Sequence, residues 1–109
     1  MNKSDNNGLL HIYGQAYYHD ETYIVGGRQS LLSLKKAIED ALETGRGSAE
    51  FFTADGEGYD TNILLREDQW ESTFWTNLAF PYSEEFARDK RENAVAPANV
   101  WYHEDKYKP

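Results

Sequence analysis

Alternation between apolar and polar side chains first develops over residues 9–18, where every second position would share one face of an extended chain. A polar break at residues 19–21 separates this stretch from a second short run, residues 22–25. Two strand-forming stretches joined by a short polar connection are typical of an antiparallel hairpin. The pattern therefore predicts a hairpin near the start of the chain.

The spacing changes to that of a helix after Gly26 and Gly27. Over residues 30–44 apolar side chains recur every three or four positions, and charged side chains cover the opposite side. We expect Ser30 to cap the first turn and Gly45 to end the last one. The buried stripe of this helix is predicted to consist of Leu31, Leu34, Ile38, Ala41 and Leu42.

A second hairpin is predicted from two strand-like segments, residues 49–54 and 59–65. They flank residues 55–58, whose sequence Asp-Gly-Glu-Gly is typical of a tight turn. The order of elements up to this point is therefore β-β-α-β-β.

Beyond residue 65 the pattern weakens. Residues 66–72 are charged and loop-like, and residues 74–80 are expected to form a short fifth strand or an irregular crossing. A short polar helix is predicted over residues 83–93, after Pro81, and residues 94–102 are predicted to be extended.

These elements predict an α+β fold. We expect an antiparallel or mixed sheet of four to five strands, with one long helix on a face and a short C-terminal helix. The chain has 109 residues and no repeat or linker, so a single domain over residues 1–109 is expected. Its ends, residues 1–7 and 103–109, are expected to be flexible.

The formal net charge of −8 limits the classes of partner. Binding to a nucleic-acid polymer depends on a basic face that neutralises phosphates, so we expect none. Two or three arginines could still serve a small phosphorylated ligand. The sequence has no stretch of about 20 apolar residues, and hence we expect no membrane partner. The chain lacks cysteine, and we expect a cytoplasmic protein.

The core is predicted to be aromatic. Leu, Ile, Val and Phe together number only 21, but the chain also has 8 Tyr and 3 Trp. Each of these rings can bury about 150–250 Å². Because the aliphatic content is small, we expect the chain to complete its burial as a homo-oligomer.

The segment around Gly26, Gly27 and Arg28 has the strongest physical case as a binding site. A strand runs into two glycines and an arginine, and a helix then begins. The N–H groups of a helix start favour an anion, and Arg28 could bind phosphate through two hydrogen bonds. The alternative is an ordinary strand-to-helix turn, because the phosphate-loop pattern of spaced glycines and lysine is absent.

Aromatic residues near the ends of elements are a second candidate. Their faces suit base stacking or a protein interface, and the alternative is that they fill the core. These residues are Tyr17, Tyr18, Trp70, Phe74, Trp75, Tyr82, Trp101 and Tyr102.

Two arginines of the predicted late helix, Arg88 and Arg91, would share one side of it and could add positive charge to a site. The alternative is pairing with neighbouring acidic side chains, Glu84, Glu85 and Asp89, on a solvated helix.

Catalysis has little support in the sequence. His11 and His19 would lie in a strand and a turn, and no spaced histidine pair or metal-binding motif is present. We therefore predict no catalytic residue, no metal ligand and no cofactor.

Several stretches distributed along the chain from residue 13 to residue 92 resemble small proteins of bacteriophages and prophages: residues 13–15 (YGQ), 19–26 (HDETYIVG), 52–59 (FTADGEGY), 78–82 (LAFPY) and 87–92 (ARDKRE). In particular, the chain resembles the signal-sequestering "sponges" of the Thoeris anti-defence family. That resemblance implies a non-enzymatic oligomer that sequesters a cyclic ADP-ribose signal made by bacterial TIR-domain enzymes, or in some members a cyclic oligonucleotide. No binding residue is carried over from the family.

Two main functions follow as hypotheses. In the first, the protein sequesters a nucleotide immune signal, with Arg28 behind Gly26 and Gly27 holding phosphate and Tyr17, Tyr18 or Trp75 stacking on the base. Arg88 and Arg91 would come from a neighbouring helix or subunit. In the second, an acidic inhibitor or immunity protein blocks a basic protein surface by electrostatic attraction. A third hypothesis is an enzyme that cleaves a nucleotide signal, with His11 or His19 as the base.

Overall fold

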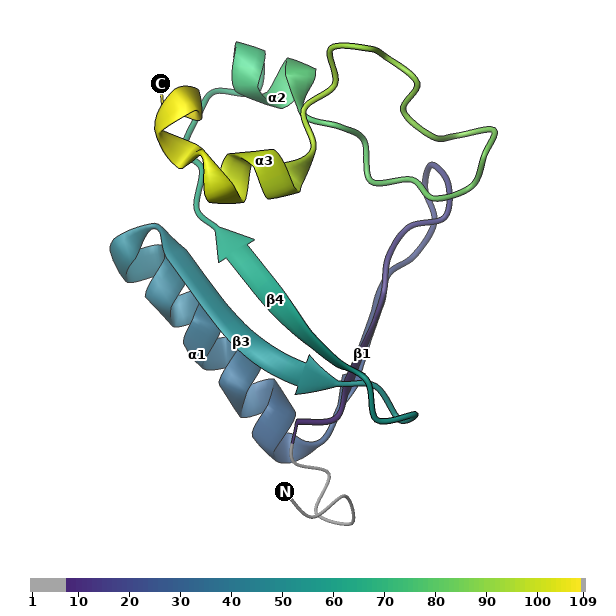
Figure 1. Ribbon diagram of the computed structural model, residues 1–109, viewed down its shortest axis with the longest axis vertical. Helices are drawn as coiled ribbons and strands as arrows, with labels where there is room; N and C mark the ends of the chain where they lie inside the picture. The colour runs from purple at the N-terminus through teal and green to yellow at the C-terminus, as the bar shows by residue number, and fades with distance from the viewer. Residues whose placement is uncertain (1–7, 109) are drawn as a thin grey trace. The chain divides into compact units, whose positions relative to one another are not determined.

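A computed structural model describes residues 8–108 (Figure 1), and these residues form two compact units. Of the described residues, the first unit takes in 8–13 and 22–66, and the second takes in 14–21 and 67–108. The fold class is α+β, as the sequence predicts. The expected flexibility of residues 1–7 falls outside the described residues, and the single domain stays a prediction.

The first unit contains both predicted hairpins. β1 (Leu10–Tyr13) pairs antiparallel with β2 (Tyr23–Gly26), and β3 (Arg46–Phe52) pairs antiparallel with β4 (Gly58–Leu64). Gly56 takes a φ of 91° in the second turn, a conformation that L side chains rarely adopt. β1 is shorter than predicted because the chain after it forms a turn, in which the Asp20 carboxylate accepts the Ala16 N–H and the Tyr17 carbonyl accepts the Asp20 N–H.

The four strands form two two-stranded sheets, which differs from the single sheet of four to five strands expected from the sequence. The two hairpins meet at one parallel bridge, between Leu9 and Phe52. The ladder does not continue beyond it because the Leu10 carbonyl accepts a hydrogen bond from the Tyr59 hydroxyl. A side chain thus occupies the acceptor that the backbone of a third strand would need.

α1 (Arg28–Thr44) begins earlier than predicted and ends as predicted. Gly27 is its N-cap, whereas Ser30, the expected cap, is buried within the first turn. Gly45 ends the helix with a φ of 101°, and its N–H donates to the Ala41 carbonyl over 2.8 Å. Glycine is favoured at this position because a side chain would strain the left-handed backbone.

The buried side of α1 differs from the predicted stripe. The residues that it buries are small: Ser30, Ala37 and Ala41. Three of the five apolar residues of the predicted stripe are exposed by 43%, 44% and 65%: Leu31, Ile38 and Leu42.

Gly47 in β3 explains why the small residues face the sheet. A Cβ atom at this position would lie 1.9 Å from the carbonyl oxygen of Ala37, so helix and strand are in backbone contact there. The larger side chains of α1 do not fit into so short a separation. The core of the first unit consequently consists of Leu10, Ala37, Ala41 and Phe51.

The second unit contains three short helices: α2 (Thr73–Asn77), α3 (Pro97–Tyr102) and the 3₁₀ helix η2 (Glu104–Tyr107). A parallel bridge between Leu78 and Val95 ties the chain that follows α2 to the chain that precedes α3. Among residues 8–108, none of the helices has the length and apolar character needed to cross a membrane.

Two predictions for this unit were wrong. Residues 74–80 contain the end of α2 and no strand, because the Ser72 side chain caps a helix by accepting the Trp75 N–H. Residues 94–102 are not extended throughout, since Pro97 occupies the first turn of α3, where proline is well tolerated. Residues 104–107 form η2, and the flexibility expected for residues 103–109 stays a prediction.

The predicted helix over residues 83–93 does not form. A single turn is present, in which the N–H groups of Ala87 and Arg88 donate to the Glu84 carbonyl. The Asp89 carboxylate then accepts the Arg91 N–H over 3.1 Å. Such side-chain bonds to the local backbone compete with helix continuation. The short C-terminal helix of the prediction is therefore replaced by α3.

Gly47→Ala should destabilise the first unit, because the added methyl group would collide with the Ala37 backbone. We expect the free energy of unfolding to fall by about 1–3 kcal/mol, the usual cost of overpacking. Urea denaturation measures this change. Gly14→Ala is the matched control, since no atom lies within 4 Å of a Cβ placed there. Equal loss of stability in both variants would contradict the close packing of α1 on β3.

Candidate functional site

Two tryptophans lie close together at the start of the second unit's helical part: Trp70 in the turn that leads into α2, and Trp75 within α2. The Ser72 N–H donates to the Gln69 carbonyl over 3.0 Å, which closes the turn around Trp70. The indole Nε1–H of Trp75 donates to the Asp68 carbonyl over 3.1 Å, so this ring has a fixed direction. Trp70 is 88% exposed, the largest exposed fraction among the exposed large apolar side chains.

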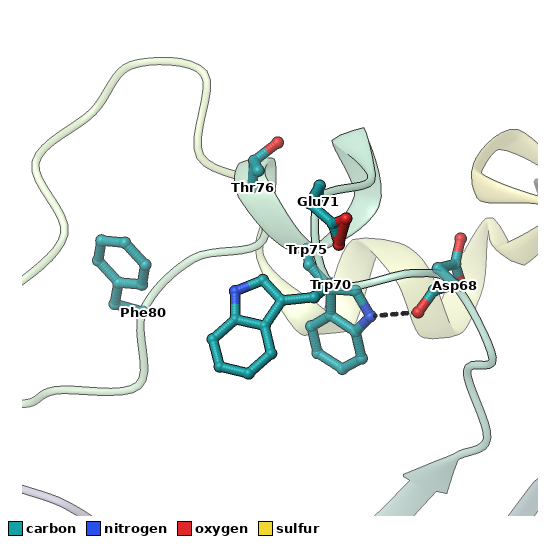
Figure 2. Close-up of a pocket in the computed structure, with 6 residues that line it drawn as sticks. All are labelled: Asp68, Trp70, Glu71, Trp75, Thr76 and Phe80. Carbon is teal, nitrogen blue, oxygen red and sulfur yellow. Dashed lines mark hydrogen bonds between the residues drawn. The ribbon is translucent and has the colours of Figure 1, made fainter.

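These tryptophans line an open pocket of about 860 Å³. Figure 2 shows its lining, in which the Phe80 ring stands across from the two indoles. We call this hollow the indole pocket, and its lining residues are Asp68, Trp70, Glu71, Trp75, Thr76 and Phe80. Its volume falls within the range of about 300–1,000 Å³ found for ligand pockets.

The charges that the sequence places beside the indole pocket are negative. Residues 67–80 include three acidic side chains and no basic one. Two of the acidic residues, Asp68 and Glu71, belong to the lining. The pocket therefore combines aromatic faces with carboxylates, a combination that favours cations.

Interactions of the Arg91 side chain with Asp89, Phe80 and nearby carbonyls, which we call the clasp, hold the Phe80 wall of the pocket. The Arg91 guanidinium lies over the Phe80 ring, with 4.6 Å between its central carbon and the ring centroid. Nε and Nη2 donate to the two oxygens of Asp89 over 3.0 and 2.7 Å. Nη1 and Nη2 also donate to the carbonyls of Thr76 and Leu78 over 2.6 and 3.2 Å. Arg91 thus has a structural role within the chain.

The Asp89 carboxylate completes this clasp. Its side chain is only 6% exposed and also accepts the Phe80 N–H over 2.9 Å. The hydrogen bonds from Arg91 first, and then the one from Phe80, hold the pKa of Asp89 far below its usual range. The same pairing raises the pKa of Arg91.

Arg88 does not join Arg91 on a helix face, because the predicted helix is absent. Its guanidinium pairs with Glu85 over 3.2 Å, and both side chains are well exposed. This pairing matches the alternative considered from the sequence, and exposed pairs of this kind contribute little stability.

Tyr17 and Tyr18 pack against other rings of the second unit. The Tyr17 ring lies 6.0 Å from that of Phe86, and the Tyr18 ring lies 5.4 Å from that of Tyr82 in an edge-on arrangement. Both tyrosines remain about half exposed. The Glu84 N–H donates to the Ala16 carbonyl over 2.8 Å, which attaches this loop to the later segment.

Gly26, Gly27 and Arg28 lie in the first unit, at the start of α1. A Cβ at Gly26 would lie 2.5 Å from the Leu10 side chain, so packing alone accounts for this glycine. The Gly27 N–H already donates to the Leu9 carbonyl over 3.3 Å. Arg28 is exposed, and no side chain caps the helix start.

The histidines have roles in local structure. The Nε2 atom of His11 accepts the Ala54 N–H over 3.0 Å, and its Nδ1 lies 2.7 Å from the Tyr13 hydroxyl. Because Nε2 accepts, the proton of the neutral ring is on Nδ1. His19 occupies a turn with a φ of 65°. Within residues 8–108, no group of three or more His, Asp or Glu side chains is arranged to hold a metal ion.

The structure assembles only some of the predicted site. Tyr17, Tyr18, Trp75, Arg88 and Arg91 belong to the second unit, and only Trp75 among them lines the indole pocket. The sequence-based site omitted Asp68, Glu71 and Phe80, and Trp70 was named only among the candidate aromatic residues. The sequence feature that points to this site is the position of Trp70 among acidic residues, in a segment with no regular spacing of apolar residues.

Comparison with known proteins found no matching family model, no matching curated protein and no matching solved structure. The resemblance to the Thoeris anti-defence family therefore stays a prediction.

Asp89→Asn tests the clasp through its pH dependence. A carboxylate whose pKa is lowered by folding stabilises the fold above its unfolded pKa of about 4, and this contribution is lost as the pH falls towards the folded pKa. We expect the variant to melt at a lower temperature than the parent at pH 7. The difference should shrink as the pH is lowered from about 4 towards 2. Glu92→Gln, at an exposed position, is the control. A difference that does not depend on pH would contradict the role given to Asp89.

Proposed function

We propose that this chain is a non-enzymatic, acidic binding protein that blocks a basic surface on another protein. This is the second of the two main functions considered from the sequence. The main support for this proposal is the exposure of Trp70. This residue is 88% exposed and lines a pocket whose charged residues are acidic.

The energetics of tryptophan support an anchoring role for Trp70. Tryptophan is enriched among the few interface residues that dominate binding energy, and truncating such a residue to alanine costs at least about 2 kcal/mol. Because the Trp70 indole is exposed, a partner could bury its surface while few of its contacts within the protein are lost. The net charge of −8 would accelerate the encounter with a basic partner.

The second candidate is the sequestration of a nucleotide immune signal in the host cytoplasm. The exposed indoles of Trp70 and Trp75 favour it as stacking surfaces, and so does exposed Arg28 at the uncapped start of α1. We rank it second because Asp68 and Glu71 would repel phosphate beside the indoles.

A homo-oligomer is part of both proposals. It is supported by the apolar side chains that α1 leaves exposed: Leu31, Leu32, Ile38 and Leu42. Association of two copies through such a helix face would bury apolar surface that each copy leaves in water.

Trp70→Ala should abolish capture of the protein partner while leaving the fold intact. Immobilised protein is exposed to a host-cell lysate at low and high salt, and captured proteins are identified and titrated. We expect the variant to bind the captured protein at least about 30-fold more weakly, the equivalent of about 2 kcal/mol. High salt should weaken the binding of the parent.

Tyr102→Ala is the control for this experiment, since Tyr102 is an exposed aromatic residue of the same unit outside the indole pocket. Equal capture by the parent and both variants would contradict the proposed role of Trp70.

The nucleotide candidate predicts a different result. The protein is mixed with cyclic ADP-ribose isomers and cyclic oligonucleotides, the filtrate is analysed, and the retained protein is heated to release any ligand. Recovery of an unaltered compound would favour sequestration, and Arg28→Ala should then weaken its binding by about 1.5–3 kcal/mol. Lys35→Ala, at another exposed cation of α1, is the control. If every compound passes through, the panel contains no ligand of this protein.

A further inference from the structure

In the described part of the chain, the outer edge of β2 has no partner strand. Among residues 8–108, β2 pairs with β1 alone. The far side of β1 is occupied by the bridge between Leu9 and Phe52 and by the Tyr59 hydroxyl. A strand edge presents backbone N–H and C=O groups that can pair with another strand. The hairpin of β1 and β2 therefore has one edge at which a further strand could be added.

The register of the hairpin shows which groups of β2 point outward. The Gly27 N–H donates to the Leu9 carbonyl in line with the ladder, so the odd-numbered residues of both strands form the hydrogen-bonded pairs. The Leu10 carbonyl consequently points away from β2, towards the hydroxyl that it binds. By the same alternation, the N–H and C=O groups of Ile24 and Gly26 point to the open edge.

The features that usually protect a strand edge are missing from β2. Charged side chains and proline commonly prevent an exposed edge from pairing. Residues 22–27 contain neither, and Tyr23, Ile24 and Val25 are exposed by 55%, 52% and 61%. An edge that is apolar and able to form backbone hydrogen bonds favours the addition of a strand.

A second copy of this chain suits the edge better than a basic partner does. The net charge of −8 makes two copies repel each other wherever acidic residues meet, but residues 22–27 have no charge. The same lack of charge gives a basic partner no electrostatic gain at this edge. Two identical strands can pair antiparallel about a two-fold axis, where each copy supplies the same groups.

The alternation of the open edge favours one register for this pairing. A two-fold axis at Ile24 pairs Ile24 of the two copies and also pairs Thr22 of each copy with Gly26 of the other. An axis at Tyr23 or Val25 would bring fewer of these outward-pointing residues opposite one another.

The side chains support the same register. Ile12 lies opposite Ile24 within the hairpin, so an axis at Ile24 would align both isoleucines of the two copies in one row across the joined sheet. These side chains are 44% and 52% exposed in the single chain and would gain burial from the pairing. On the other face, Val25 of each copy would lie beside Tyr23 of the other, a pairing of β-branched and aromatic side chains that stabilises sheets.

We propose that β2 pairs antiparallel with β2 of a second copy, centred on Ile24, and that this joins the two hairpins into one continuous sheet. This inference rests on the homo-oligomer included in the proposed function, and it names the edge through which two copies join.

Disulfide formation can map the pairing, because the chain contains no cysteine of its own. Residues of a hydrogen-bonded pair have Cα atoms about 5.5 Å apart, within the range of about 4.4–6.8 Å that a disulfide needs. Ile24→Cys should therefore crosslink two copies under mild oxidation. Val25→Cys is the matched control, because its Cα atoms in the two copies would be about 7–8 Å apart. We expect it to crosslink at least about tenfold more slowly.

A mixture of two variants tests the register. Positions 23 and 25 lie opposite each other across the proposed axis, so Tyr23→Cys mixed with Val25→Cys should crosslink faster than either variant alone. Faster crosslinking of Val25→Cys alone than of Ile24→Cys would place the axis at Val25 and would overturn the proposal.

Sedimentation velocity measures whether the edge holds the copies together. We expect Ile24→Lys to raise the dissociation constant of the dimer at least about tenfold, because two like charges would meet at the axis. Tyr102→Lys, at an exposed aromatic residue of the second unit, is the control, and circular dichroism verifies that both variants fold. If Leu42→Ser, on the exposed side of α1, separates the copies and Ile24→Lys does not, the proposal fails.

Two outcomes separate this inference from the proposed blocking of a basic surface. If the parent is a monomer that still captures a basic protein through Trp70, the pairing of β2 fails and the blocking function stands. If Trp70→Ala leaves capture unchanged while Ile24→Cys crosslinks as expected, the blocking function fails and the pairing stands.

Discussion

The clasp between Arg91 and Asp89 is the interaction on which the candidate site depends. It joins the segment after α2 to a later loop, through two bonds to the carboxylate, two bonds to backbone carbonyls and contact with the Phe80 ring. Each of these groups is polar or aromatic, and among the described residues of the second unit only Ala87 and Val100 are buried apolar residues. Phe80 belongs to both the clasp and the lining of the indole pocket, so the clasp holds this wall of the pocket in place.

The sequence predicted the elements that local rules determine, and it failed where contacts between elements decide. The long helix, its end at Gly45 and the two hairpins follow from periodicity, glycine conformation and turn chemistry. The single sheet was not predicted correctly, because the Tyr59 hydroxyl takes the Leu10 carbonyl at the hairpin junction. The buried side of α1 was missed because Gly47 selects small residues, and hydrophobicity alone does not reveal such a backbone contact.

The sequence indicated which chemical groups form the candidate site better than it indicated where in the structure they lie. An excess of aromatic residues near the ends of elements indicated a platform, and Trp75 lines the pocket. Arg91 was assigned to a ligand because Asp89 was expected only as a neighbour on a solvated helix, whereas its carboxylate ends the turn and binds the guanidinium. Gly26 was assigned to phosphate binding, whereas its close approach to Leu10 is sufficient reason for glycine. For Arg91, pairing with Asp89 was the alternative considered from the sequence, whereas for Gly26 the sequence did not reveal the group that it contacts.

The acidic lining of the indole pocket should make the surroundings of Trp70 favourable to cations. This expectation is tested most directly by comparing how caesium and iodide ions quench the fluorescence of Trp70, in a variant where Trp75 and Trp101 are replaced by phenylalanine. Both ions reach an exposed indole, so their relative efficiency reports the sign of the local potential. Stronger quenching by caesium, measured against acrylamide as the neutral reference and reduced by added salt, is the result that we expect. Stronger quenching by iodide would mean that the pocket attracts anions, which contradicts a basic partner at Trp70.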